Sequence, residues 1–277
     1  MVDKPVELRE GEEEEAEDRS TPRPHVVYVA VEKEGEEELS RPLAAVAWSA
    51  LAAGLSMGFS MVGEGILRAK LPDAPWRELV SGFGYSMGFL IVVLGRQQLF
   101  TENTLTVVLP LLTRPRWSTL GRMLALWAVV LAANVVGALL FAWVAGTRGA
   151  FDGPVQAAFA DLGRAQVSAG FGLTVLKAVY AGWLIALMVW LLPTAESARV
   201  FVIVLVTWLV GIGSFCHSIA GSVAVLYLVT HGQMSAGAFL GQFFVPTVIG
   251  NVIGGTSLVA ALAHAQVQPS RPQRQLH

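Results

Sequence analysis

The last third of the chain contains the feature that most constrains its fold. Residues 200–270 include no aspartate, glutamate, lysine or arginine over 71 consecutive positions. A helix that crosses a bilayer needs about 20 apolar residues, so this stretch is too long to be one such helix. Soluble domains place charged side chains on their surfaces at much shorter intervals. The stretch therefore predicts at least two membrane-spanning helices.

The composition of the whole chain agrees with a membrane protein. Hydrophobic residues make up 54% and charged residues only 14% of it, whereas soluble domains carry about 25% charged residues. These values exclude fibrous and nucleic-acid-binding classes as well as soluble ones. A single cysteine excludes an internal disulfide and a zinc site built from thiolates. No Walker loop, HExxH or GxSxG motif is found. We therefore expect no enzyme, metal site, cofactor or nucleic-acid partner.

Hydropathy predicts an all-α fold with six transmembrane helices. The second and the fifth predicted spans are interrupted, the second by the polar residues 96–104 and the fifth by a glycine-rich polar segment at 211–218. The six expected spans are residues 42–63, 79–95, 123–146, 167–192, 200–230 and 238–267.

The two interruptions fall at matching places, in the second of the first three spans and the second of the last three. A short motif repeats with them. Asn134-Val-Val-Gly137 begins 33 residues after Thr101, and Asn251-Val-Ile-Gly254 begins 34 residues after His217. Matched broken helices are typical of inverted repeats whose site lies between the halves. We therefore predict an inverted 3+3 repeat with broken helices 2 and 5.

Residues 1–41 differ from the rest, because they hold 14 of the 21 acidic residues. Like charges repel and few apolar residues are present, so we predict a disordered acidic tail. A docking or regulatory role of this tail is the alternative. Residues 42–267 are the expected membrane domain, and residues 268–277 a disordered C-terminal tail. Lysine and arginine near the span ends favour both termini in the cytoplasm.

The breaks point to a site for anions. Half-helix N-termini direct positive partial charge toward the middle of the membrane. Thr101 lies beside the first break and His217 within the second. An ionisable group deep in a membrane is a functional candidate, and an imidazole can donate a hydrogen bond or move a proton. The alternative is a neutral His217 that is bonded to a helix carbonyl or to Asn251.

Four further polar residues are candidates for supporting roles. Glu102 is expected to pair with Arg96 or Lys177, although it could instead repel anions or relay protons. Lys177 is expected to be paired or to extend toward the interface, and less readily to line an anion vestibule. Asn134 and Asn251 are expected to tie interrupted backbone or helix contacts together.

Three segments resemble motifs of the formate/nitrite transporter family. LFTENT, residues 99–104, resembles the loop of the family's broken second helix. FCHSIAGS, residues 215–222, resembles the motif of the broken fifth helix, and PTVIGNVIGG, residues 246–255, that of the sixth. The order and number of spans agree with the family from about residue 42 to 267.

This resemblance implies an aquaporin-like protomer of six helices in the inner membrane, a homopentamer, and one pore in each protomer. It implies passage of small monovalent anions such as formate, nitrite, acetate, lactate or hydrosulfide, together with protons, in a protein surrounded by lipid. His217 resembles the family's central pore histidine, and Thr101 the loop threonine that faces it. The implied constriction residues are Leu99 and Phe89 on the inner side and Tyr85 and Val210 on the outer side.

The expected function is therefore anion passage that is linked to protons through His217, or that depends on His217 as a charged or strongly donating group. The alternatives are an aquaporin-type pore for neutral solutes or weak acids, and a membrane protein without transport whose acidic tail binds a partner. The chain differs from the family's usual pattern at four positions. Glu102 replaces a small residue, Gly182 and Gly221 replace asparagines, and Gln166 lies where a lysine is usual.

Overall fold

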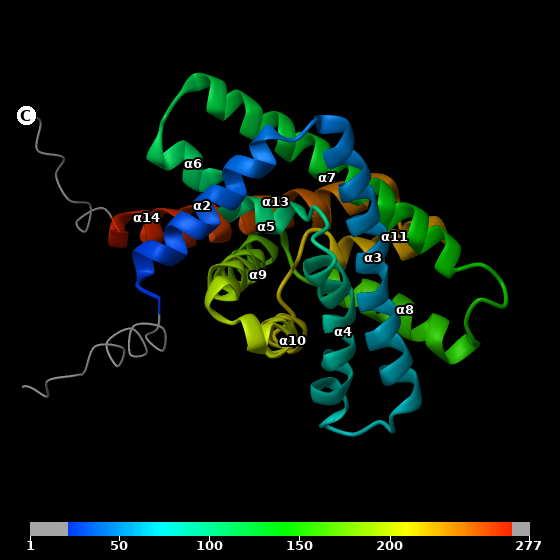
Figure 1. The fold of residues 1–277 in the computed structure, drawn as a ribbon. Helices are drawn as coiled ribbons and strands as arrows, with labels where there is room; N and C mark the ends of the chain where they lie inside the picture. The colour runs from blue at the N-terminus through cyan, green and yellow to red at the C-terminus, as the bar shows by residue number, and fades with distance from the viewer. Residues whose placement is uncertain (1–21, 268–277) are drawn as a thin grey trace, which may run out of the picture.

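The computed structural model of the protein describes residues 22–267. Every regular element among these residues is helical, as the sequence predicted, and the helices pack as a bundle (Figure 1). The acidic run at residues 12–18 and the predicted C-terminal tail at residues 268–277 lie outside the described residues.

Five helical segments are long and apolar enough to cross a membrane. Each matches a predicted span, with ends that extend several residues further in some cases. The last is one uninterrupted helical segment that contains two π-helical stretches, η3 and η4, on either side of α13. The five are α3 (Leu43–Lys70), α4 (Arg77–Leu94), α7 (Trp117–Ala145), α9 (Phe171–Leu191) and the final segment α12 (Ala236–Ala238), η3 (Phe239–Phe244), α13 (Val245–Val252), η4 (Ile253–Ala260) and α14 (Ala261–Val267).

The predicted fifth span consists of two shorter helices. α10 (Arg199–Ile212) and α11 (Ala220–Thr230) are separated by a non-helical segment. A bilayer needs about 20 helical residues, so neither half crosses by itself. The predicted interruption after α4 is also present. Two short helices, α5 (Phe100–Thr106) and α6 (Val108–Thr113), follow it.

One prediction is corrected in the acidic segment. We expected residues 1–41 to be disordered, but residues 24–40 form helix α2 (Pro24–Ser40). Val27, Tyr28 and Val31 share one buried face, and the hydroxyl of Tyr28 lies 2.8 Å both from Oγ1 of Thr113 and from Nδ1 of His264. Figure 1 shows α2 beside α6 and α14. The high average charge concealed this apolar face, because most of the glutamates lie on the other sides of the helix.

A second helix outside the predicted spans is α8 (Gly153–Gln166), which follows α7 through a short loop. The side chain of Asp152 accepts a hydrogen bond of 3.0 Å from the backbone N–H of Val155 at its first turn. That bond, together with the ammonium of Lys70, lowers the pKa of Asp152. Asp152 is thus an N-cap residue that stabilises the start of α8.

Two helix pairs approach each other closely at matching asparagines. A Cβ added to Gly54 of α3 would lie 2.2 Å from the backbone oxygen of Asn134 in α7. A Cβ added to Gly182 of α9 would lie 2.3 Å from the backbone oxygen of Asn251 in α13. Only glycine permits such distances, as is usual where membrane helices pack tightly. The family's usual asparagine therefore has no room at position 182 in this chain.

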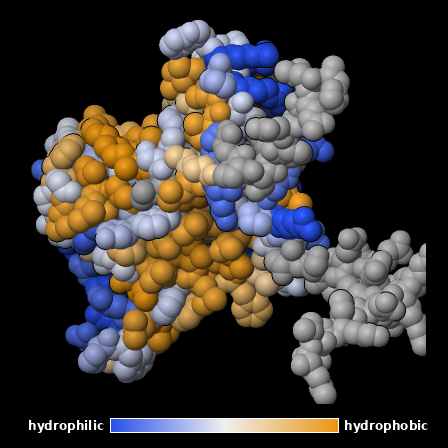
Figure 2. Space-filling view, turned by 90° about the vertical axis from the view of Figure 1, so that its left-hand side faces the viewer, coloured by the Kyte–Doolittle hydropathy of each residue, from blue (hydrophilic) through white to orange (hydrophobic). Residues whose placement is uncertain are grey.

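The surface is hydrophobic over a broad area. Figure 2 shows apolar residues across the middle of one face, with hydrophilic residues gathered toward its margins. Large exposed apolar side chains include Trp143, Phe201 and Leu205. Such a surface suits contact with lipid, because hydrocarbon chains impose no cost on exposed apolar groups.

Candidate functional site

Helix α4 is followed by a residue whose backbone has the left-handed conformation. Arg96 has φ 49°, which is uncommon for a residue with a side chain. The backbone N–H of Gln97 donates to the carbonyl of Val92 at 2.9 Å, and that of Arg96 to Val93 at 3.2 Å. This pair of bonds closes the helix end in the manner of a Schellman motif.

The end of α10 has the same construction. Ser214 has φ 51°. The backbone N–H of Phe215 donates to the carbonyl of Val210 at 3.1 Å, and that of Ser214 to Gly211 at 3.0 Å. The two predicted breaks therefore share their local backbone geometry.

An asparagine holds each break in place. Oδ1 of Asn134 accepts the backbone N–H of Phe100 at 3.0 Å, and Oδ1 of Asn251 accepts that of Ser218 at 2.8 Å. Each Nδ2 donates to one carbonyl of the broken segment and one carbonyl of a neighbouring helix. The accepting carbonyls are those of Gln98 (2.9 Å) and Ala50 (2.7 Å) for Asn134, and those of Cys216 (2.9 Å) and Ala178 (2.8 Å) for Asn251.

Both asparagines are fully buried. Interrupted backbone groups at membrane depth need partners from within the protein, because lipid supplies none. The two side chains meet that need at equivalent places in the two halves of the chain.

The two breaks meet at Thr101 and His217. Oγ1 of Thr101 lies 2.7 Å from Nε2 of His217, and both residues are fully buried. Nδ1 of His217 faces the backbone N–H groups of Ile219 at 3.2 Å and Ala220 at 3.1 Å. Two donors directed at Nδ1 require an unprotonated nitrogen there. The proton of the neutral ring is therefore on Nε2, which donates to Thr101.

Aromatic rings continue from His217 along α4. The ring of Phe89 lies edge-on to His217 with centroids 5.0 Å apart, and Tyr85 contacts Phe89 at 5.4 Å. Phe89 is fully buried. The structure thus brings together four of the residues selected from the sequence. The other two implied constriction residues, Leu99 and Val210, are also fully buried.

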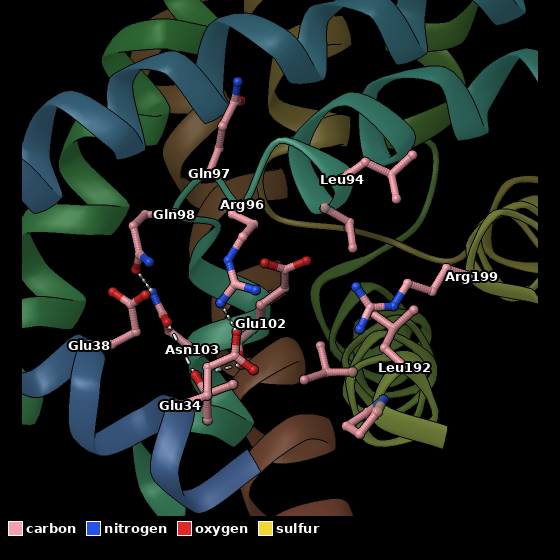
Figure 3. Close-up of a pocket in the computed structure, with 14 residues that line it drawn as sticks. Glu34, Glu38, Leu94, Arg96, Gln97, Gln98, Glu102, Asn103, Leu192 and Arg199 are labelled. Carbon is pink, nitrogen blue, oxygen red and sulfur yellow. Dashed lines mark hydrogen bonds and ion pairs between the residues drawn. The ribbon is translucent and has the colours of Figure 1, made fainter. Parts of the chain in front are cut away.

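A cavity of about 200 Å³ opens at the C-terminal end of α4. We call it the α2-side cavity, because α2 contributes to its lining. Its charged residues are Glu34 and Glu38 of α2, Arg96, Glu102 and Arg199. Figure 3 shows Glu34, Arg96 and Glu102 extending into the same space. Arg96 forms an ion pair of 3.3 Å with Glu34. Burial raises the pKa of Glu34, and Arg96 acts against that rise.

A second cavity of about 120 Å³ lies toward the opposite end of α4. We call it the α8-side cavity, since Leu162, Ala165 and Gln166 of α8 line it. Tyr85 and Val210 also line it. Its ionisable lining residues are Glu64, Arg68, Glu78, Tyr85, Lys177 and Cys216.

The predicted pairing of Glu102 differs from what the structure contains. Arg96 is paired with Glu34, and Lys177 lines the α8-side cavity, whereas Glu102 lines the α2-side cavity. Within residues 22–267, Glu102 has no ion pair, and its Oε1 is enclosed without a hydrogen-bond partner. Lys177 was expected to be paired or to extend toward the interface, and less readily to line a vestibule; it lines the α8-side cavity.

Gly221, which replaces another usual asparagine, also has a packing reason. A Cβ added there would lie 2.4 Å from the ring of Phe243 in η3. Phe243 is fully buried, so it fills the space that a larger side chain at position 221 would need.

Sequence reasoning missed the carboxylates that α2 brings to the α2-side cavity. Glu34 and Glu38 could not be assigned there while the segment was expected to be disordered. The spacing of Val27 and Val31, one helical turn apart, was the available signal. Glu64 was also missed, since it lies just past the predicted end of the first span. In the described part of the chain, no group of three histidine, cysteine, aspartate or glutamate side chains could hold a metal ion.

Comparisons with known proteins place the chain in a family. A family model described as formate/nitrite transporter matches residues 25–265. Inner membrane protein YfdC of Escherichia coli K12 is 40% identical over 252 residues, which cover 91% of this chain and 81% of that protein. Formate channel FocA of the same organism is 26% identical over 210 residues, covering 66% and 71% of the two chains.

A solved structure described as a pentameric formate channel with formate bound has a similar fold. It superposes with a TM-score of 0.67 over 82% of this chain and 98% of that one, at 17% sequence identity.

Proposed function

The chain belongs to the formate/nitrite transporter family, as its three motifs predicted, and from that membership we propose that it carries small monovalent anions across the membrane. The proposed path runs from the α2-side cavity, between Leu99 and Phe89, past Thr101 and His217, and between Tyr85 and Val210 to the α8-side cavity. Formate and nitrite are the first substrates to test. Acetate, lactate and hydrosulfide are further candidates of the same charge and size class.

The observation that carries this proposal is the contact between Thr101 and His217. The two helix breaks meet there, between two cavities that lie toward opposite ends of α4. An N–H donor in an enclosed site interacts strongly with an acceptor such as an anion oxygen. An oxygen of the arriving substrate can replace Thr101 as the acceptor of the Nε2 proton. His217 thus acts in the proposal as a neutral donor.

Proton linkage follows from the apolar constrictions. The proposed path is bounded by Leu99, Phe89 and Val210, all fully buried. A bare anion pays a large desolvation penalty between apolar side chains, whereas a neutral acid pays much less. We therefore propose that the anion crosses together with one proton.

The arrangement proposed for the whole protein has six spans, with α10 and α11 together forming the fifth. The matched asparagine contacts and the matched helix ends support an inverted, aquaporin-like 3+3 repeat. A homopentamer in the inner membrane with both termini in the cytoplasm completes the proposal. Cross-linking of the protein in native membranes tests the number of subunits.

The direct test measures uptake into liposomes that contain the purified protein. Formate, nitrite, acetate and lactate are offered at about pH 5.5 and about pH 7.5, beside the His217→Ala variant. Uptake that increases at low pH and is lost in the variant is the expected result. Glycerol uptake without anion uptake would instead favour the neutral-solute alternative. Absence of anion uptake by folded wild-type protein would overturn the proposal.

A further inference from the structure

Each cavity beside the proposed pore contains one carboxylate that has no ion pair among the described residues. These are Glu102 in the α2-side cavity and Glu64 in the α8-side cavity. The remaining carboxylates of the two cavities are all paired. Glu34 pairs with Arg96, Glu38 with Arg41, and Glu78 with Arg68 at 3.7 Å.

Glu102 occupies a position that is directly linked to the proposed pore. It follows Thr101 in α5, and Thr101 is the residue that contacts His217. Its Oε1 is enclosed and has no hydrogen-bond partner, although it lines the cavity. An unpaired carboxylate is costly to enclose, whereas its protonated form is neutral and can donate a hydrogen bond.

Several ionisable groups line the cavities around the two carboxylates, but among the described residues none of them forms an ion pair with Glu102 or Glu64. Around Glu102 they are Glu34 and Glu38 from α2, Arg96 from the segment after α4, and Arg199 from α10. Around Glu64 they are Arg68 from the same helix, Glu78 and Tyr85 from α4, Lys177 from α9, and Cys216 from the second break.

His217 is poorly placed to take up the proton that the anion needs. Its Nδ1 already accepts two backbone N–H groups, and its Nε2 carries the proton that Thr101 accepts. A second proton on Nδ1 would face two donors and displace both hydrogen bonds. His217 is therefore not the group that supplies the proton that accompanies the anion.

We propose that Glu102 and Glu64 exchange a proton with the transported anion at the two ends of the pore. This inference rests on the function proposed above. At the α2 side, the O–H bond of the Glu102 carboxyl breaks, and a new O–H bond forms on the anion. The neutral acid then accepts a hydrogen bond from Nε2 of His217 as it passes. At the α8 side, its O–H bond breaks, the proton binds the Glu64 carboxylate, and the anion leaves.

The cycle is balanced with water as the only other proton source. Glu102 regains a proton from water on its side, and Glu64 releases one to water on the other side. One anion and one proton cross in each cycle, and the reverse direction uses the same steps. The two acidic residues thus serve a pore for anions, although their charge would repel a bare anion.

The test compares Glu102→Gln and Glu64→Gln with two matched controls in the same liposomes. Glu36→Gln removes an acid on the α2 side that pairs with Arg114, and Asp161→Asn removes one on α8 that pairs with Arg164. Neither control residue lines the α2-side or the α8-side cavity. Formate uptake is measured from about pH 5.5 to about pH 8, with internal pH recorded by a dye.

We expect the two glutamine variants to take up formate about a hundredfold more slowly than wild type near pH 8, because a positioned acid contributes about that factor. The loss should shrink toward pH 5.5, where water itself supplies more of the neutral acid. Glu102→Asp should keep the wild-type pH profile, and both controls should transport as wild type does.

Two results for the glutamine variants would overturn the inference. Unchanged or faster uptake by both glutamine variants near pH 8 would mean that the carboxylates only repel anions. An equal loss at every pH, with normal elution and thermal stability, would mean that they act only through structure. If wild-type protein takes up no anion, the proposed function is wrong. This outcome is distinguished from a failure of the inference alone, because it is measured on wild type before any variant is compared. Uptake of the cation methylammonium by wild type in place of formate would overturn both the proposed function and this inference.

Discussion

Oγ1 of Thr101 and Nε2 of His217 lie 2.7 Å apart, although 116 residues separate them in the chain. This contact joins the segment after α4 to the segment after α10 at a fully buried point. Each partner lies beside a helix end that is closed by a left-handed residue. The contact therefore serves the stability of both breaks as well as the proposed passage of anions.

Replacing Thr101 with valine should destabilise the protein by about 1–3 kcal/mol, because it leaves the buried Nε2–H of His217 without an acceptor. Thermal unfolding in detergent measures the change. The matched control is Thr207→Val. The hydroxyl of Thr207 is also buried but donates only to the carbonyls of Ile203 and Val204 in its own helix. Equal stability of the two variants would contradict the prediction.

The two asparagines should be of similar importance, since each satisfies three backbone groups. Asn134→Leu and Asn251→Leu should each lose on the order of 3 kcal/mol or more in unfolding free energy. Asn251→Asp should also be destabilised, because two carbonyls would then face a carboxylate. Gln233→Leu, at an exposed glutamine, controls for the loss of an amide. A strong effect of only one asparagine would argue against equivalent breaks.

Restoring the family's usual residue by Gly182→Asn should harm this chain. The new Cβ would lie 2.3 Å from the backbone oxygen of Asn251, so α9 and α13 would have to separate. Overpacking of this kind costs about 1–3 kcal/mol, and more where backbone must move. Gly172→Ala is the control, because nothing lies within 4 Å of a Cβ at that position. Normal yield and stability of Gly182→Asn would show that the helices can shift.

The stability of α8 should depend on the ionisation of Asp152. The backbone N–H of Val155 and the ammonium of Lys70 lower the pKa of Asp152 in the folded state. Its contribution is therefore complete above the unfolded pKa of about 3.9 and is lost as the pH falls through the lower folded value. Asp152→Asn keeps a capping side chain but cannot ionise. Its thermal midpoint should fall less than that of wild type between about pH 5 and pH 2, and parallel curves would contradict this.

Helix α2 should detach when its buried face becomes polar. Val31→Asp introduces a charge at a fully buried position, and such an unpaired charge costs several kcal/mol. We expect faster cleavage by a protease between α2 and α3, measured from the yield of the shortened chain. Val29→Asp is the control, since Val29 is exposed. Equal cleavage rates would mean that α2 does not depend on this face.

The sequence was most informative where a physical requirement leaves a local pattern. Long apolar segments and the polar interruptions located the spans and both breaks, and the repeated motif located Asn134 and Asn251. The prediction of disorder was wrong for α2, because the high average charge of the segment hides a narrow apolar face at Val27 and Val31. The lining of the α2-side cavity could not be predicted, since Glu34 reaches it only through the packing of α2. The protonated nitrogen of His217 depends on backbone geometry that no residue type specifies.

The hydrogen bond between Tyr28 and His264 spans 236 positions of the chain and has a consequence for the order of assembly. α2 precedes α14 in the chain, so it leaves the ribosome before its partners there are made. The earliest of the described helices is thus one of the last that can complete its packing. Until then its apolar face has no partner in α14, and a chain truncated before residue 264 cannot complete that closure.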